Sequence, residues 1–559
     1  MSEEEKKTDT KESDDKKKDS SEQAAKFKAA LRKMLSAAKL QLIRFLKFIW
    51  KYLKEFVLFC IQLMAAAWER FHVYFIRSRK KNLRMKKKLD SKEYLVYRIR
   101  RIPHDLKYAI PALAGPVLIL LAAIFLVRGV ISAGHSLMGR NAGRETEEIV
   151  LETETETEKV YAEADLTVGS TGCMLLHSPF IDSYPDQDGN YDFSSIFKYI
   201  TPYYSKPDFM TCEFEGSLGG EELGYSGYPM FISPDIIIQN LRDSGIDLQY
   251  LASNHIYDGM SYGFHRTMDV YNEHAIAFSG IRESKNDKQY YVADVNGVRL
   301  GFLDYVYETV GEGTNLNGIP LEAQDADLVN SFDSDDLESF YKEVEANIVE
   351  MKSVGVQFII MQMHWGIEYQ LTESEEQDAM AQRLCDLGVG AVIGGHPHCE
   401  QPIDLIMSKD QSHAMFCIYS EGNALSNQRT YLLDEMPTGH TEDGSMITLH
   451  LHRDTAGNVT ITDVELLPTW VYRYQDTSGS KYFILPLDDV DSLPALTGIK
   501  DLGQDPANSY QRTMEVLGGG LEKANNYFHA QNQARIAREQ ALAAETETGS
   551  ETEEEGSAK

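Results

Sequence analysis

The chain has 559 residues, of which 43% are apolar and 25% charged, so it is not disordered throughout. Six cysteines are too few for a fold built on disulfides. The formal net charge of −31 is divided unevenly. Residues 1–108 carry 29 Lys and Arg against 14 Asp and Glu, and subtraction from the totals of 55 and 86 leaves 26 basic and 72 acidic residues in 109–559. A chain with one basic end and one very acidic remainder is not typical of a simple cytosolic enzyme.

The basic end contains two predicted regions. Residues 1–25 are highly charged and lack aromatic side chains, which predicts disorder. Residues 26–108 combine helical periodicity with many Lys and Arg, which predicts a basic amphipathic helical region. This region is expected either to lie on anionic membrane lipid or to pack against partner membrane subunits. Because lipid explains the positive charge, no nucleic acid partner is expected.

A transmembrane helix is predicted over 109–131. Its first nineteen residues, 109–127, contain no charged side chain, and at 1.5 Å per residue they span roughly 29 Å, the thickness of a bilayer core. Thirteen Lys and Arg lie between Arg77 and Lys107, and few follow the segment. The positive-inside rule therefore predicts a single-pass protein of the cell membrane, with its N-terminus in the cytoplasm and its C-terminal domain outside the cell.

The exported part is predicted to hold one globular domain between two acidic segments. Residues 132–164 form a Glu/Thr-rich linker, and 165–500 form the domain. A helical extension over 501–538 and a disordered acidic tail over 539–559 are expected to follow.

Strand-like and helical segments alternate through the domain, which predicts a layered α/β fold. Strands are expected at 165–172, 208–214, 247–253, 276–280, 356–363 and 391–395, and helices at 233–245, 261–274, 335–353 and 374–387. Two hairpins are also expected, one over 290–306 that turns at Asn296-Gly297 and one over 445–468.

Polar residues with metal-binding side chains follow five of these strands. In open α/β sheets, ligands bind at the carboxyl ends of the strands. Imidazole, carboxylate and amide oxygen from several loops suit one or two divalent cations. In chain order these residues are Cys173, His177, Glu213, Glu215, Asn254, His255, Asp258, His364, His396 and His398.

The order of these motifs resembles the CapA/PgsA family of poly-γ-glutamate capsule synthesis proteins, within the calcineurin-like metallophosphoesterase superfamily. The resemblance covers roughly 166–472. It rests on the segments CEFEGSLGG, LASNHIYDG, HWGIEYQ, GGHPHCEQP and YSEGN.

The resemblance implies a four-layered α/β/β/α sandwich that holds one or two divalent metal ions, Zn or Mn. It places Glu215 between the two metal positions. Asn254, His364 and His396 would complete one position, and His398 would join Cys173 and His177 at the other. His255 would be the general acid, with Asp258 as the second catalytic residue. The residues expected to contact substrate are Trp365, Glu368, Tyr369 and Asn423.

Two positions depart from the family pattern. Cys173 stands where the family has Asp, and Glu213 stands where it has Asn. Thiolate binds zinc but is a poor ligand for Mn²⁺. Three explanations are open: the metal is zinc-like, Glu213 replaces the lost carboxylate, or one metal position is empty.

Three functions are compatible with these features. The first is a role in the synthesis or export of an anionic capsule polymer such as poly-γ-glutamate, with polymer synthase or exporter subunits as partners. The second is a surface phosphoesterase or other metal-dependent hydrolase that is independent of capsule. The third is a catalytically inactive binding module. The sequence is therefore compatible both with an enzyme and with a protein that only binds its ligand.

Overall fold

The computed structural model describes residues 160–311, 313–477 and 479–556, with side chains as far as residue 541. The chain divides into two compact units, 1–153 and 154–559, and every described residue belongs to the second. The predicted disordered, amphipathic and transmembrane segments lie outside the described residues. Within the described part, no helix is long and apolar enough to span a bilayer.

The first sheet has β1 at its centre. β1 pairs in parallel with β2 and β14 and antiparallel with β15, and the strand order is β17-β16-β15-β1-β2-β3-β4. The bounds are β1 Ala164–Leu175, β2 Phe209–Glu215, β3 Leu248–Tyr250, β4 Ala277–Ser279, β14 Asn423–Leu425, β15 Asp443–Arg453, β16 Val459–Asp476 and β17 Gly479–Pro486.

The second sheet has β10 and β11 at its centre. Its order is β12-β13-β11-β10-β6-β5, with β9 paired to β6, and β6, β10, β11 and β13 run parallel. The bounds are β5 Tyr290–Val295, β6 Val298–Tyr307, β9 Ser331–Phe332, β10 Phe358–His364, β11 Ala391–Gly395, β12 Glu400–Met407 and β13 Ala414–Glu421. A small separate hairpin joins β7 Asn315–Leu316 to β8 Ile319–Pro320.

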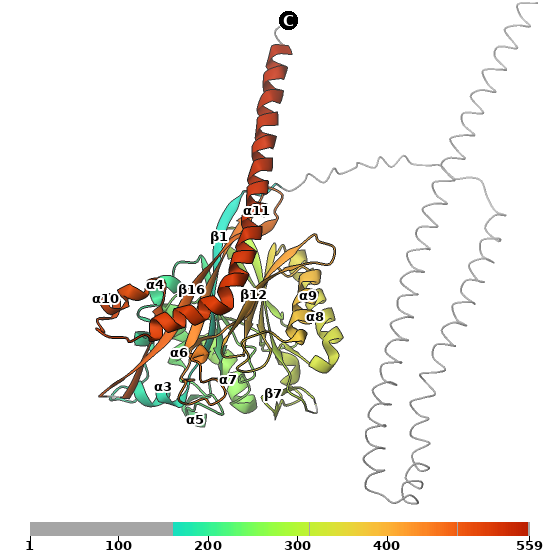
Figure 1. The fold of residues 1–559 in the computed structure, drawn as a ribbon. Helices are drawn as coiled ribbons and strands as arrows, with labels where there is room; N and C mark the ends of the chain where they lie inside the picture. Colours follow the sequence, from blue (N-terminus) through green and yellow to red (C-terminus); the bar gives the residue numbers. More distant parts are fainter. Residues whose placement is uncertain (1–159, 312, 478, 557–559) are drawn as a thin grey trace, which may run out of the picture. The chain divides into compact units, whose positions relative to one another are not determined.

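Helices cover the outer face of each sheet, so the domain has four layers (Figure 1). One buried cluster joins the facing sides of the two sheets, for example Phe209 of β2 and Phe302 of β6, whose ring centroids lie 5.0 Å apart. A second cluster packs helices against the first sheet, and a third packs α8 and α9 against the second. The bounds are α3 Ser178–Ser183, α4 Thr201–Tyr204, α5 Gly220–Leu223, α6 Ile236–Asp243, α7 Met260–Glu273, α8 Leu337–Ser353, α9 Glu375–Leu387, α10 Leu493–Thr497 and α11 Asp505–Gly556.

Local sequence signals explain where these elements begin and end. The β5–β6 hairpin turns at Asn296 and Gly297, both with positive φ (52° and 77°), as a tight hairpin turn requires. At the start of α9, Ser374 and Gln377 form a reciprocal capping box, and Gly388 ends the helix in the left-handed conformation. The predicted mixed α/β architecture is therefore present.

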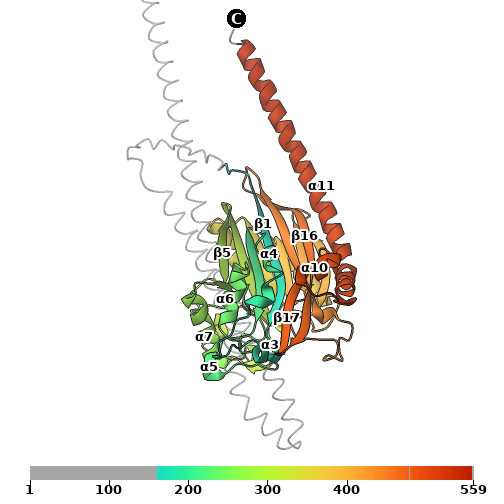
Figure 2. The same cartoon turned by 90° about the vertical axis from the view of Figure 1, so that its left-hand side faces the viewer.

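The last helix, α11, differs from the expected C-terminal extension. It runs from Asp505 to Gly556, through much of the segment 539–559 for which an acidic disordered tail was expected. The segment is rich in Ala and Glu, which are strong helix formers. The first part of α11 packs on the sheets through Leu517, Ala524 and Phe528, and its C-terminal part extends beyond them (Figure 2).

Candidate metal centre

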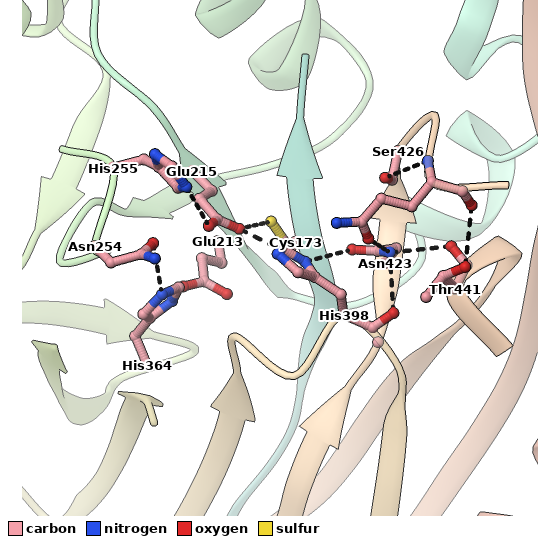
Figure 3. Close-up of polar contacts among 12 residues, drawn as sticks. Cys173, Glu213, Glu215, Asn254, His255, His364, His398, Asn423, Ser426 and Thr441 are labelled. Atoms are coloured by element: carbon pink, nitrogen blue, oxygen red, sulfur yellow. Dashed lines mark hydrogen bonds and ion pairs between the residues drawn. The ribbon is translucent and has the colours of Figure 1, made fainter. Parts of the chain in front are cut away.

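Side chains from both sheets converge where the central parallel strands end. β1 and β2 bring Cys173, Glu213 and Glu215, and the loop after β3 brings Asn254. β10 ends on His364, and the loop after β11 carries His396 and His398. All seven side chains are buried. Figure 3 labels six of them, and their contacts divide these six into two sets of three.

The first set, here called the Cys173 group, consists of Cys173, Glu215 and His398. The Cys173 Sγ donates a 2.7 Å hydrogen bond to Glu215 Oε2, and His398 Nδ1 lies 4.0 Å from the same oxygen. The three side chains offer ligand atoms that all lie within 4.8 Å of one another. Burial and then the charge of Glu215 raise the pKa of the Cys173 thiol well above its ordinary value. A nearby cation would favour the thiolate.

The second set, the His364 group, consists of Glu213, Asn254 and His364. The imidazole of His364 is hydrogen-bonded through Nδ1 to Glu213 Oε1, and its Nε2 lies 3.1 Å from Asn254 Oδ1. Burial acts to lower the pKa of His364, but the charge and the hydrogen bond of Glu213 outweigh it and leave this pKa raised. The carboxylate of Glu213 is therefore paired with His364.

The ring of His396 packs against that of His364, and the backbone of His396 has an unusual left-handed conformation. Its ring centroid is 4.7 Å from that of His364, and burial together with the neighbouring imidazoles lowers its pKa well below the ordinary value. His396 and His398 both have positive φ, 92° and 56°. A Cβ at Gly395, the residue before His396, would lie 2.0 Å from Glu213 Oε2, so a side chain there would displace the Glu213 carboxylate.

His255 and Asp258 form a dyad beside Glu215. His255 Nδ1 lies 2.7 Å from Asp258 Oδ2, and Nε2 lies 3.8 Å from Glu215 Oε1. Burial opposes the charged form of His255, but the bond to Asp258 and the charge of Glu215 leave its pKa raised. Asp258 also accepts the backbone N–H of Phe231, which fixes the carboxylate. The arrangement suits His255 to hold a proton on Nε2 and donate it.

The unpaired atoms of these residues fit a bound cation. Glu213 Oε2, Glu215 Oε1 and His396 Nδ1 are buried, and none has a hydrogen-bond partner among the described residues. Leaving such groups unpaired is costly. Burial acts to raise the pKa of Glu215, yet the imidazoles of His398, His364 and His255 outweigh it, so this pKa is lowered. An ionised, partly unpaired carboxylate among imidazoles is a suitable divalent-metal ligand.

An open cleft of about 760 Å³ lies above the centre. The predicted residues His177, His255, Glu368, Tyr369 and His398 all line it. His177 belongs to neither group. Its Nδ1 accepts the backbone N–H of Asn427 at 3.3 Å. Burial lowers the pKa of His177 to about 4, so its imidazole is neutral. The remaining lining residues are Leu175, Tyr228, Phe231, Ile367, Asn427, Gln428, Leu432, Leu433 and Glu435.

Two residues expected to contact substrate lie elsewhere. Trp365 is 1% exposed, packs in the cluster under α8 and α9, and donates from Nε1 to the carbonyl of Tyr419 at 2.9 Å. Neighbouring residues of an extended segment point to opposite faces, so Trp365 faces away from the site into which His364 points. Asn423 is buried behind His398, and its Oδ1 lies 3.2 Å from His398 Nδ1. It therefore orients the imidazole and does not line the cleft.

Tyr307 is a site residue that sequence reasoning missed. Its ring centroid lies 4.7 Å from that of His396, and its ring is parallel to that of His364 at 6.1 Å. It is the last residue of β6, which pairs with β10 so that Val306 is opposite His364. Tyr307 directly follows the hairpin predicted over 290–306, but the strand-end rule considers only metal-ligand side chains and therefore does not select a tyrosine.

Comparisons with known proteins agree on one family. Residues 167–428 match the family described as "Bacterial capsule synthesis protein PGA_cap". A capsule biosynthesis protein CapA of Bacillus anthracis is 24% identical over 261 residues, which cover 46% of this chain and 57% of that protein. A PGA biosynthesis protein CapA of Bacillus subtilis (strain 168) is 23% identical over 328 residues, or 56% of this chain and 75% of that protein.

Two solved structures show only a distant likeness. The sulfate thiohydrolase SoxB of Thermus thermophilus, determined with glycerol, aligns with 62% of this chain and 60% of its own at 10% identity and a TM-score of 0.30. The protein TT1561, also of Thermus thermophilus, aligns with 51% of this chain and 94% of its own at 10% identity and a TM-score of 0.26.

Proposed function

Because this chain belongs, through residues 167–428, to the family of bacterial capsule synthesis proteins, we propose that it acts in the synthesis or export of an anionic capsule polymer such as poly-γ-glutamate. The proposal places one or two divalent ions, Zn or Mn, at the candidate metal centre. The observation that carries it is the position of Glu215, whose two oxygens face His255 on one side and Cys173 and His398 on the other.

The residues that would hold the metal come from both groups. Cys173, Glu215 and His398 would hold one ion, and Asn254, His364 and His396, with Glu213, would surround the other. A bound divalent ion would stabilise negative charge that develops on an oxygen of the substrate. Support for this assignment comes from the unpaired buried oxygens of Glu213 and Glu215.

The protein's own proton donor would be His255. Asp258 holds Nδ1 and thereby leaves Nε2 directed to Glu215, next to the cleft. The apolar walls of the cleft, which include Phe231 and Ile367, would exclude water from the reacting bond. We therefore propose a metal-dependent hydrolase-type site within a four-layered, metallophosphoesterase-like domain.

The cleft lining favours a second candidate function. Glu368 and Glu435 line the cleft, and Lys and Arg are absent from its lining among the described residues. A polyanion would meet repulsion there unless the metal ions offset it. This observation supports a surface hydrolase whose substrate carries less negative charge than a capsule polymer.

A complementation experiment tests the proposal and separates the two candidates. The full-length chain would be expressed in a capsule-forming bacterium that lacks its own relative, with His398→Ala as the site variant and the exposed Asp294→Ala as the control. We expect the parent and the control to restore surface polymer and His398→Ala to fail. If the parent restores no polymer but the purified protein hydrolyses a generic phosphodiester, the capsule-independent function is the correct one.

The membrane arrangement is part of the proposal. The span at 109–131 would anchor the chain, and the preceding basic region would contact lipid or the synthase and exporter subunits. Protease added to intact protoplasts should remove the large domain and leave the first hundred residues protected. Protection of the large domain would overturn both the topology and the surface role.

A further inference from the structure

A second cluster of metal-ligand side chains lies away from the candidate metal centre, where the start of β1 meets β15 and α11. We propose that Glu163, His452 and Glu539 form a structural site for a divalent cation, with zinc as the best-fitting ion. The ligand atoms offered by these three side chains all lie within 4.8 Å of one another.

The pairing of β1 with β15 brings two of the three ligands together. Asp165 is directly opposite His452 in this antiparallel pair, so their side chains share a face of the sheet. Glu163 precedes Asp165 by two residues and points to the same face in an extended chain. The backbone is fixed here, because Arg453 donates two hydrogen bonds, at 3.0 and 2.8 Å, to the carbonyl of Ala162.

His452 supplies the observation that points to a bound ion. Its side chain is 7% exposed, and its Nδ1 lies 2.7 Å from Asp165 Oδ1. Its Nε2 is buried and has no hydrogen-bond partner in the part of the chain that the structure describes. Asp165 thus occupies Nδ1, and Nε2 is the ring nitrogen that is free to bind a cation. A carboxylate on the other ring nitrogen is the usual support of a metal-binding histidine.

Glu539 brings the C-terminal helix to the same site. Arg535, one turn earlier on α11, donates to both Glu539 oxygens at 2.9 and 3.0 Å, which fixes the carboxylate. Each carboxylate oxygen can accept a further interaction, so this pair leaves room for a metal bond. The ion would therefore tie the C-terminal part of α11 to the first strand of the domain.

The donor set indicates which ion binds. One imidazole and two carboxylates match zinc, which accepts nitrogen and oxygen ligands at four-coordinate sites, better than Mg²⁺ or Ca²⁺, which prefer oxygen alone. With three protein ligands, water would complete the coordination. Because the ion joins distant parts of the chain, its expected effect is on the opening of α11 and not on the reaction.

Hydrogen–deuterium exchange of the purified full-length protein tests the inference locally. Zn²⁺ at ten times its dissociation constant should slow exchange of the amides at 530–545 by about tenfold, since a ligand bound only to the closed form stabilises it by mass action. His452→Gln and the exposed Glu163→Gln should both abolish this protection. Mg²⁺ at the same concentration should give none.

Matched controls separate this site from the candidate metal centre. His398→Ala should leave the zinc protection of 530–545 intact, whatever its effect on capsule output. His450→Gln, the same change two residues away on β15, should also leave it intact. The inference is overturned if zinc fails to protect the parent, if Glu163→Gln and His452→Gln retain protection, or if His450→Gln removes it.

Discussion

The two groups of the candidate metal centre differ in how their carboxylates are used. In the His364 group, Glu213 is paired with an imidazole, and Asn254 lies on the other nitrogen of the same ring. In the Cys173 group, Cys173 and His398 both face Glu215 Oε2. Glu213, which the resemblance implies is a carboxylate additional to the family pattern, therefore lies with the His364 group. The carboxylate that the resemblance implies Cys173 replaces would belong to the other group, so Glu213 does not take its place.

Glu215→Gln should have the largest effect, because the Glu215 carboxylate faces Cys173 and His398 on one side and His255 on the other. Removing its charge leaves His398 and His255 without their anionic partner, so we expect loss of the bound metal and of capsule output. Metal analysis of the purified variant, beside the exposed control Glu221→Gln, measures this. Retention of full metal content by Glu215→Gln would remove Glu215 from the set of metal ligands.

His255→Ala should separate proton transfer from metal binding. Loss of a general acid costs roughly 10²–10⁴ in rate, while both groups keep their ligands. The measurement is turnover of a generic phosphodiester together with metal content. Asp258→Asn should reduce the rate less, because it disturbs only the orientation of His255. Unchanged turnover in His255→Ala would leave the dyad with a structural role.

Cys173→Asp should change the metal preference of one group only. The substitution replaces a soft thiolate by an oxygen ligand, so affinity for Mn²⁺ should rise about tenfold relative to Zn²⁺. Competition binding of the two metals measures the ratio. Cys173→Ser, which offers neither thiolate nor carboxylate, is the control and should weaken both metals. An unchanged ratio in Cys173→Asp would remove Cys173 from the ligand set.

Glu421→Gln should change the pH dependence of stability, with no change in the metal ligands, and it reports on the charge of Glu213. Burial, with a contribution from the charge of Glu213, raises the pKa of Glu421 to about 8. A carboxyl whose pKa is raised in the folded state stabilises the fold below its ordinary pKa of 4.5 and loses this contribution as the pH rises toward 8.

Glutamine does not ionise, so the variant does not lose stability at this position as the pH rises. The stability of Glu421→Gln relative to the parent should therefore increase between pH 5 and 8, by at most about 1.4 kcal/mol per pH unit. Denaturant unfolding at a series of pH values measures this difference. A difference that does not change with pH would mean that Glu421 is ionised throughout.

Much of the fold could be predicted because it depends on local patterns. The Asn-Gly turn, the capping residues of α9 and the apolar strands all follow from short stretches of sequence. The site residues were found because parallel strands deliver their ends to one edge of a sheet. The sequence does not show which residues at a strand end face the cleft, because the direction of each side chain depends on the exact residue at which the strand ends. Trp365 was predicted to contact substrate, but its side chain faces the core. Tyr307 was not predicted as a site residue, but its ring lies against His396.

Contacts between segments that are distant in the chain could not be predicted from the sequence either. Nothing local to Asn423 shows that it lies behind His398. Likewise, the position of α11 depends on packing across the sheets. The helix α11 is longer than predicted, because the helix propensity of its residues outweighs the acidic composition from which disorder was predicted.

The contacts of α11 also define the smallest part of this protein that can be expected to fold alone. Arg512 on α11 holds Asp443 through two hydrogen bonds of 2.6 and 2.7 Å, and Thr513 holds Glu400 at 3.0 Å. Both carboxyl groups are buried. A chain shortened to the matched segment 167–428 would lose β15, the antiparallel partner of β1, and would leave Glu400 without Thr513. A longer chain that ended before α11 would leave Asp443 without Arg512. Breaking a buried charge pair costs about 3–5 kcal/mol, a large share of the stability of a domain, so the autonomous unit must include Arg512 and Thr513.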